Sequence, residues 1–369
     1  MQEIKKNRIV LASVLKPVDE PRMFERLGQS LATNGYEVFI IGQVPASAKI
    51  VEGVHFVSHN KINRISTRRI MIRFKILKKI FSIRPNILIV TTHELLGIAL
   101  LYKLLTRNKI VYDVQENYCM NLMHTHAWPQ ILRWPMAMTI RLKETFSAPF
   151  ISKFILAENC YSHELFFTKN NSVVVENKCR VPTGFLRKPS HENIKLIFTG
   201  TLAESTGIFQ AIALAKKLYT EEPLIRLKIV GYCPMQSTLK KIHNEIRNSH
   251  FITITGGDEF VSHEVILKEI ASAHFGIVYY PHSPHTINKI PSKLYEYLAC
   301  QLPILLQPNP KWINLCQPHH SCIVVDFGHL DTASILSKTK EGKFYPSEID
   351  SAKWPVEEAT LIACIKSLN

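Results

Sequence analysis

The sequence predicts an α/β protein that consists of two doubly wound domains. Short apolar runs of strand length alternate with amphipathic segments of helix length along most of the 369 residues. This alternation is typical of parallel sheets that are covered by helices on both faces. It is interrupted once, by the polar, proline-containing stretch "KCRVPTGFLRKPSH" at 178–191, and then begins again. Two such series on either side of a linker predict two domains that face a central cleft.

The first series contains seven apolar runs that we expect to form strands. They lie at 9–14, 38–42, 54–57, 87–91, 109–114, 154–157 and 172–176. Amphipathic helices are expected between these strands, for example at 22–34 and 95–106.

The second series repeats the pattern after the linker. Strands are expected at 194–199, 226–231, 251–255, 275–280 and 303–306, and helices at 207–219, 236–248, 262–272 and 356–367. We therefore expect a first domain at 1–183, joined by a C-terminal helix at 354–369, and a second domain at 184–353. In doubly wound sheets ligands bind at the carboxyl ends of the strands, so site residues are expected in the loops there.

Composition narrows the class of protein. An apolar content of 46% supports two real cores and excludes a disordered chain. The start, "MQEIKKNRIVLASVL", lacks the pattern of a signal peptide, and no window predicts a transmembrane helix. The eight cysteines are scattered without a Cys-x-x-Cys pair, so we expect free thiols rather than disulfides or a zinc site. These features predict a cytoplasmic protein.

The net charge of +15 is unevenly distributed. Residues 1–180 carry 26 basic and 13 acidic side chains, whereas residues 181–369 carry 19 and 17. A strongly basic half predicts an anionic partner, which leaves nucleic acid, phospholipid and a phosphorylated substrate as candidates.

The segment "NKIPSKLYEYLACQLPIL" at 288–305 predicts a helix that begins at Pro291 and Ser292, with Ser292 as its cap. Lys293 then lies in the first turn, where the helix dipole disfavours a cation. An anion opposite the helix start would remove this conflict. The alternative is an ordinary surface pair between Lys293 and Glu296, which lie three residues apart on one face.

The segment "LIFTGTLAESTGI" at 196–208 predicts a strand, a turn at Gly200 and Thr201, and a helix that begins near Gly207. Backbone N–H groups at such a turn can hold a phosphate. The alternative is a tight turn that simply requires glycine.

The stretches "FTGTLAESTGI", "LKIVGY" and "FGIVYYPHSPHTINKIPSKLYEYLACQLPIL" together resemble the carboxyl domain of GT-B glycosyltransferases of family four, such as those of bacterial polysaccharide and glycolipid assembly. The resemblance spans roughly 194–306. It implies two Rossmann-like domains and a donor site for a nucleotide-sugar. In the first half, "NGYEV", "VYDVQENY" and "VVVENKC" are similar to family segments, though less strongly.

Donor residues follow from this resemblance. Gly200 and Thr201 would meet the diphosphate, and Glu296 would match the second Glu of the family's pair and hold the ribose. Asn288 stands where the first Glu is usual. The family's cations near the glycine turn are missing, so Lys293, with Lys289 second, is expected to neutralise the diphosphate beside the helix start at Ser292. Lys293 and Glu296 are thus predicted catalytic residues.

On the first domain, His93 ends a strand and is the third predicted catalytic residue, with helix capping or packing as the alternative. Gln115 replaces the histidine of the family's Asp-x-His-Glu segment. Asp19, Arg22 and Glu116 are the predicted acceptor-side residues, with local capping as the alternative for Glu116. In the loop before the donor motif, His282 and His285 are predicted either to touch the donor sugar or to be solvated.

The resemblance implies transfer of a sugar from a nucleotide-sugar, UDP-linked rather than GDP-linked, to a saccharide or lipid-linked acceptor. It implies retention of anomeric configuration and neither a metal nor another cofactor. The product would belong to a cell-surface polysaccharide or glycolipid.

A basic stretch, "KINRISTRRIMIRFKILKKIFSIR" at 61–84, carries nine Lys and Arg residues and no acidic one. Its stripe Ile70, Phe74, Leu77 and Phe81 is expected to pack on the sheet, which leaves the charges outside. Together with the Trp-rich segment 126–146, these charges predict attachment to an anionic membrane, at the inner face of the plasma membrane.

Three other functions are compatible with the sequence. A nucleotide-sugar 2-epimerase would share the fold, but its acid and base residues are not evident. A nucleic-acid-binding protein would suit the charge, but no recognition motif is present, so no nucleic-acid partner is expected. A non-catalytic partner subunit would suit Asn288, Gln115 and the missing diphosphate cations.

Overall fold

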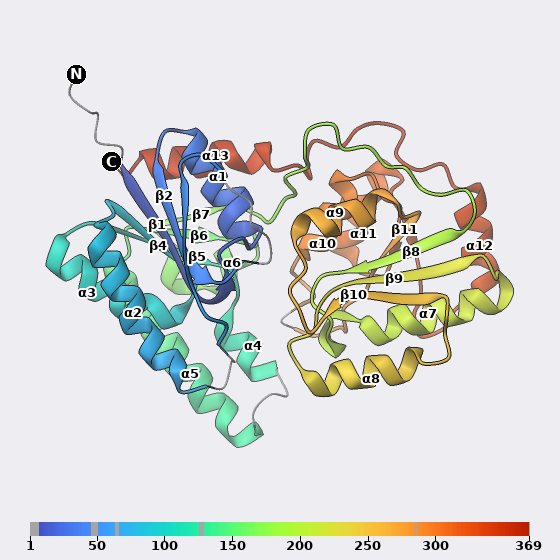
Figure 1. Cartoon of the computed structure of the whole chain (residues 1–369), viewed down its shortest axis with the longest axis horizontal. Coiled ribbons are helices and arrows are strands. Elements are labelled where there is room, and N and C mark those ends of the chain that lie inside the picture. Colours follow the sequence, from blue (N-terminus) through green and yellow to red (C-terminus); the bar gives the residue numbers. More distant parts are fainter. Residues whose placement is uncertain (1–6, 46–50, 63–65, 125–128, 285, 369) are drawn as a thin grey trace. The chain divides into compact units, whose positions relative to one another are not determined.

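The computed structural model describes residues 7–45, 51–62, 66–124, 129–284 and 286–368. The chain divides into two compact units, one formed by Met1–Asn177 with Glu357–Asn369 and the other by Lys178–Val356 (Figure 1). The first unit thus ends at Asn177, whereas the sequence placed the boundary at 183. Among the described residues, none of the helices combines the length and apolarity that crossing a bilayer requires.

Unit 1 is built on a seven-stranded parallel sheet in the order β3-β2-β1-β4-β5-β6-β7. Its strands are β1 (Arg8–Pro17), β2 (Glu37–Gln43), β3 (Val54–His59), β4 (Ile87–Val90), β5 (Lys109–Val114), β6 (Lys153–Leu156) and β7 (Ser172–Val174). Each of the seven expected strands is confirmed. Strand β4 is buried throughout, and β1 is buried from Ile9 to Val14, as continuous apolar runs predict for a sheet covered on both faces.

Helices cover both faces of this sheet. They are η1 (Arg22–Gly28), α1 (Gln29–Thr33), α2 (Arg68–Ile83), η2 (His93–Leu95), α3 (Leu96–Thr106), α4 (Tyr118–His124), α5 (Gln130–Ser147), η3 (Ala148–Phe150), α6 (Tyr161–Glu164), η4 (Phe166–Thr168) and α13 (Pro355–Lys366). The helix expected at 22–34 is present, but its first part, η1, has the wider π-helical winding.

The expected packing of α2 is wrong for Ile70 and Phe74 but right for Phe81, which packs against the core of unit 1. Its core face consists of Ile72, Ile76 and Ile80, which are at most 7% exposed. Ile70 and Phe74, expected to pack on the sheet, are 54% and 64% exposed. The helix carries apolar residues on more than one side, so periodicity alone did not indicate which side the sheet would cover.

Unit 2 contains a six-stranded parallel sheet in the order β10-β9-β8-β11-β12-β13. Its strands are β8 (Ile194–Thr199), β9 (Ile225–Tyr232), β10 (Ile252–Gly257), β11 (Phe275–Val278), β12 (Ile304–Leu306) and β13 (Cys322–Val324). Its helices are η5 (Glu204–Thr206), α7 (Ile208–Glu221), α8 (Gln236–Ile246), α9 (His263–Ala271), α10 (Ser292–Ala299), α11 (Pro310–Cys316), η6 (Gln317–His319) and α12 (Thr332–Glu341). The sequence did not predict β13, α11 or α12.

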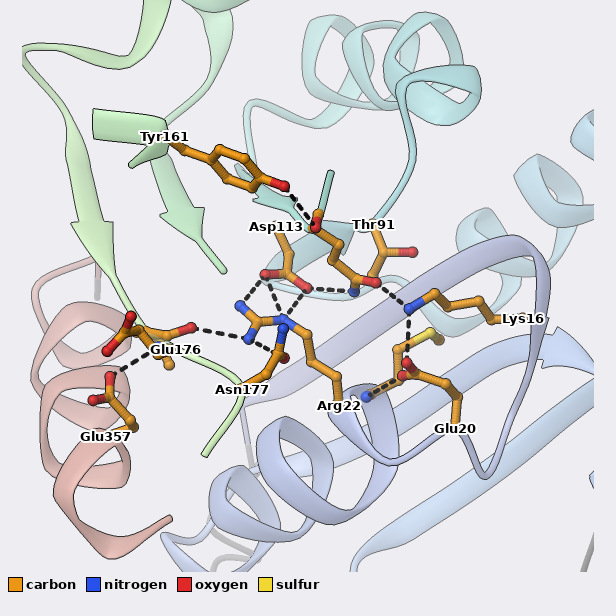
Figure 2. A network of polar contacts seen from close by, with 12 residues as sticks. Lys16, Glu20, Arg22, Thr91, Asp113, Tyr161, Glu176, Asn177 and Glu357 are labelled. Carbon is orange, nitrogen blue, oxygen red and sulfur yellow. Dashed lines mark hydrogen bonds and ion pairs between the residues drawn. The ribbon is translucent and has the colours of Figure 1, made fainter. Parts of the chain in front are cut away.

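Two segments at the edge of unit 2 run side by side where the chain enters and leaves it. Cys179 and Lys353 form a parallel bridge, and the N–H of Trp354 donates to the carbonyl of Cys179. Beyond this point α13 belongs to unit 1, where the Glu357 carboxylate accepts a hydrogen bond from the N–H of Glu176 (Figure 2).

Gly207 is required at the start of α7. Its φ is +82°, and an added Cβ would lie 2.5 Å from Tyr279 Cδ1 and 2.8 Å from the Tyr279 carbonyl oxygen. We expect Gly207→Ala to lower the free energy of unfolding by about 2–4 kcal/mol, because backbone strain and a steric clash add. Urea denaturation measures this change.

Gly35→Ala is the matched control. Gly35 also has a positive φ, of +90°, but a Cβ there would meet open space. The Gly35→Ala variant should lose only about 1–2 kcal/mol of its free energy of unfolding, from backbone strain alone. Equal losses in the two variants would contradict the contact with Tyr279.

Candidate functional site

Helix α10 is fixed against the carboxyl end of β8 by a hydrogen bond to its second half. The Tyr297 hydroxyl accepts a hydrogen bond from the Thr199 N–H at 3.2 Å and lies 3.0 Å from Thr199 Oγ1. Both side chains are fully buried. Thr199 directly precedes Gly200, so the structure places α10 beside the predicted glycine turn.

Lys293 projects from the first turn of α10 into this contact. The residue is only 6% exposed, and Nζ lies 3.8 Å from the centre of the Phe198 ring and 5.2 Å from that of Tyr280. Among the described residues Nζ has no hydrogen-bond partner. Burial lowers the pKa of the ammonium to about 7, although the nearby Glu296 carboxylate acts in the opposite direction. An ammonium held this way is costly unless an anion compensates it.

The Glu296 carboxylate contacts a histidine, His263, that was not predicted from the sequence. Its Oε1 lies 3.4 Å from Nε2 of His263, and the side chains are 12% and 2% exposed. His263 is the first residue of α9, after Ser262, whose hydroxyl accepts a hydrogen bond from the Val265 N–H. The imidazole thus lies against the buried side of the Glu296 carboxylate. The only available signal was its position just beyond the carboxyl end of β10.

The remaining predicted donor residues lie closer to the surface. Thr201, Asn288 and Ser292 are exposed. Gly200 has a φ of +98°, so the turn itself requires glycine. The prediction that Ser292 caps α10 is wrong: the cap residue is Pro291, its side chain accepts no hydrogen bond, and Ser292 is the first helical residue.

The loop before α10 is held by residues that sequence reasoning did not single out. Gln307 Oε1 accepts from the Tyr280 N–H at 2.8 Å, and Asn309 Nδ2 donates to the Ile287 carbonyl at 3.1 Å. Trp312 Nε1 donates to the carbonyl of Lys289 at 2.7 Å. These contacts come from α11 and from the residues between β12 and α11, whose position beside the loop depends on the tertiary fold. His282 is exposed, and His285 lies outside the described residues.

At the carboxyl edge of the unit 1 sheet, Arg22 forms a buried ion pair with Asp113 (Figure 2). The two residues are 2% and 0% exposed. Arg22 Nη2 donates to Asp113 Oδ1 at 2.6 Å, while Nη1 donates to the Val175 carbonyl and to Asn177 Oδ1. The guanidinium is therefore fixed inside unit 1, and its burial argues against the predicted contact with an acceptor.

Gln115 links this pair to the loop that follows β1. Its Nε2 donates to Asp113 Oδ2 at 2.6 Å, and its Oε1 accepts from Lys16 Nζ (Figure 2). Lys16 also donates to Glu20 Oε1 at 2.7 Å. Burial would raise the pKa of Glu20, but the charge and hydrogen bond of Lys16 lower it below its ordinary value. The loop after β1 is thus held by an ordered polar network.

His93 begins η2 and packs edge to face on Tyr118, with ring centres 4.9 Å apart. Burial lowers the pKa of its imidazole to about 4; Glu94 opposes this, while Lys143, Arg69 and Arg73 add to it. His93 is therefore neutral at pH 7. The ring contact agrees with the packing alternative, and a neutral imidazole can still accept a hydrogen bond.

The other two predicted acceptor-side residues, Glu116 and Asp19, differ in how far their side chains are exposed to solvent. Glu116 is exposed and accepts a hydrogen bond from Asn121 Nδ2 at 2.7 Å, whereas Asp19 is half-buried. Within the described ranges, no three His, Cys, Asp or Glu side chains are grouped as ligands for a metal ion.

Comparisons of the sequence with protein-family models and with curated proteins gave no match. Solved structures, however, match nearly the whole chain. Sucrose-phosphate synthase from Thermosynechococcus elongatus has a TM-score of 0.69 at 13% identity and covers 98% of this chain and 99% of its own. Anabaena HepE in complex with UDP-glucose has a TM-score of 0.67 at 11% identity. For α,α-trehalose 6-phosphate synthase from Burkholderia multivorans the TM-score is 0.66 at 10% identity. Both matches cover 98% of this chain and 99% of the other chain.

These similarities, at such low identities, concern the fold. Together with the two parallel sheets they confirm the GT-B fold, with two Rossmann-like units.

Proposed function

We propose that this chain is a glycosyltransferase that moves a sugar from a nucleotide-sugar donor to a saccharide or lipid-linked acceptor. The GT-B fold and the UDP-glucose held by Anabaena HepE support a nucleotide-sugar donor. The same complex favours UDP over GDP. The observation that carries the proposal is the buried Lys293 ammonium without a hydrogen-bond partner among the described residues, at a helix start beside a glycine turn.

Departure of a nucleoside diphosphate requires stabilisation of its developing charge. In our proposal Lys293 and the N–H groups at the start of α10 supply this stabilisation, with Lys289 as a second cation. The turn at Gly200 and Thr201 holds the diphosphate, Glu296 accepts hydrogen bonds from the ribose, and Asn288 contacts the donor sugar.

On the acceptor side, we propose that the neutral His93 accepts a hydrogen bond from an acceptor hydroxyl, with Glu116 and Asp19 nearby along the same sheet edge. The departing phosphate takes up the acceptor proton, which gives retention without a strong protein base or a metal. Arg22 has a positioning role, since it fixes Asp113 and, through Gln115, the loop after β1.

We further propose that the product belongs to a cell-surface polysaccharide or glycolipid, and that the protein acts in the cytoplasm on the inner face of the plasma membrane. The net charge of +13 on residues 1–180 supports an anionic membrane as a partner.

Calorimetric titration with UDP and GDP tests the donor site. We expect UDP to bind the wild type, and Glu296→Ala to weaken binding roughly 10- to 100-fold, because a hydrogen bond to a charged group contributes about 1.5–3 kcal/mol. Glu245→Ala is the matched control, since Glu245 lies on α8 in an exposed pair with Lys216 and should leave the affinity unchanged.

Two results would count against the proposal. If neither nucleotide binds, the non-catalytic partner subunit becomes the better explanation of the fold. If UDP binds equally well to wild type and to Glu296→Ala, the assignment of Glu296 to the ribose is wrong.

A further inference from the structure

Three neighbouring helices of unit 1 expose large apolar side chains. On α2 these are Ile70, Met71 and Phe74, on α3 Leu101, Leu104 and Leu105, and on α5 Ile131, Leu132, Trp134, Leu142 and Phe146. Their exposed fractions range from 42% at Leu101 to 84% at Ile131. Single exposed apolar residues are ordinary, but such a concentration on adjacent helices indicates a binding surface.

These helices meet at a groove of about 210 Å³. It is lined by Ile70, Arg73 and Phe74 of α2, Glu94 of η2, Gly97 and Ile98 of α3, and Lys143 of α5. Leu101, Leu104 and Leu105 follow Gly97 at helical spacing, so they lie on the face of α3 that the groove occupies. Phe146 likewise lies one turn beyond Lys143. The exposed apolar residues therefore continue from the groove along the helices.

The groove is also positively charged. Arg73 and Lys143 line it, and its one carboxylate, Glu94, is already paired with Arg69. Around it, α2 carries no acidic residue and α5 carries only Glu144, which is buried. Burial, followed by the charge of Arg73, lowers the pKa of Lys143, although the Glu94 and Glu144 carboxylates act in the opposite direction. A bound anion would relieve the repulsion between these two cations.

We infer that the α2–α3–α5 face is a docking surface for an anionic bilayer, with a lipid phosphate held in the groove between Arg73 and Lys143. The exposed apolar side chains enter the acyl region, and the lysines of α2 lie at headgroup level. Apolar residues mixed with Lys and Arg on helices are the pattern of interfacial membrane binding. Protein–protein interfaces are instead depleted of Lys. RNA is bound by aromatic stacking, whereas eight of the eleven apolar side chains named above are not aromatic.

The groove also adjoins His93, because the next residue in η2, Glu94, lines it. A lipid phosphate there lies beside the sheet edge that we assign to the acceptor. The docking surface deepens the membrane partner named in the proposed function, and this step also rests on the acceptor side assigned there.

The first experiment measures binding of the full chain to vesicles of phosphatidylcholine alone and with 30% phosphatidylglycerol. We expect binding to the anionic vesicles that weakens as salt is added. Phe74→Ser should reduce the partition coefficient roughly tenfold, since a large apolar side chain no longer leaves water. Leu186→Ser is the matched control, because Leu186 is 69% exposed on unit 2, outside this surface.

A second set of variants tests the phosphate site. Replacing Arg73 and Lys143 together by Gln should weaken anionic vesicle binding roughly tenfold or more. The same change at Lys240 and Lys338, exposed on unit 2, should have little effect. At Gly97, where a Cβ meets open space, Gly97→Glu should weaken binding, while the equally large Gly97→Gln should weaken it much less.

Equal binding to neutral and anionic vesicles would overturn the inference, as would no binding at low salt. Binding of a single-stranded RNA without binding of vesicles would also overturn it and indicate RNA as the partner. UDP calorimetry on the same preparation separates the two proposals. Absence of vesicle binding with UDP binding intact refutes the docking surface and the membrane partner, but leaves the proposed sugar transfer standing.

Discussion

Arg22→Ala is expected to lower the free energy of unfolding by about 3–5 kcal/mol, because it leaves the Asp113 carboxylate buried without its counter-ion. Asp113 is 0% exposed, and Arg22 donates to both of its oxygens. The loss also removes the hydrogen bonds of Arg22 to Val175 and Asn177, so β7 and the end of unit 1 lose their link to η1.

Urea denaturation followed by circular dichroism measures this loss. Arg8→Ala is the matched control: Arg8 pairs with Glu37 at 2.8 Å, but its side chain is 41% exposed. Exposed pairs contribute about 0–1 kcal/mol, so the control should change little. Similar losses in the two variants would mean that the Arg22–Asp113 pair does not hold the sheet edge as described.

Replacing Lys293 by Met is expected to increase the stability of the protein and to weaken its binding of UDP. Lys293→Met should raise the free energy of unfolding near pH 7 by about 2–4 kcal/mol, because an apolar side chain of similar length replaces a buried ammonium. The same change should strongly weaken UDP binding if Lys293 neutralises the diphosphate. A residue that only stabilises the fold would not behave in this way.

The pH dependence follows from the lowered pKa of Lys293. Folding moves this pKa from its ordinary value of 10.5 down to about 7, so between these pH values the unfolded chain binds a proton that the folded chain lacks. The stability of the wild type should therefore rise with pH through this window. The gain in free energy of unfolding from Lys293→Met should be largest at pH 7 and below, and should vanish near pH 10.5.

Urea midpoints at several pH values, with UDP titrations at pH 7, test both parts. Lys311→Met is the control, since Lys311 is exposed on α11 and the change should stay within about 0.5 kcal/mol. A destabilised Lys293→Met variant at pH 7 would show that the ammonium is well compensated in the free protein.

Most of the fold was predictable because its strands are buried on both faces. Continuous apolar runs such as those of β1 and β4 leave few alternatives to a parallel sheet. In contrast, β13 spans only Cys322–Val324 and is partly exposed, so its apolar signal is too short to be distinguished from a loop.

The candidate residues could be named from the sequence, but their contacts could not. A strand end indicated His93 and the helix start after Pro291 indicated Lys293, whereas Glu296 was expected from the family resemblance. No pattern in the sequence indicates that Asp113, 91 residues away, lies against Arg22, or that His263 contacts Glu296. Such pairs depend on which strands become neighbours, and on helix orientation, which local periodicity does not determine.

The return of α13 to unit 1 has a consequence for how the protein is made. Leu361 and Ile365 are fully buried there, yet they follow the whole of unit 2 in the chain. During synthesis, unit 2 is continuous and can fold as soon as it has left the ribosome. Unit 1 emerges first but must wait for its last helix, with the surface under α13 uncovered in the meantime. The unit that is translated first is thus the one completed last.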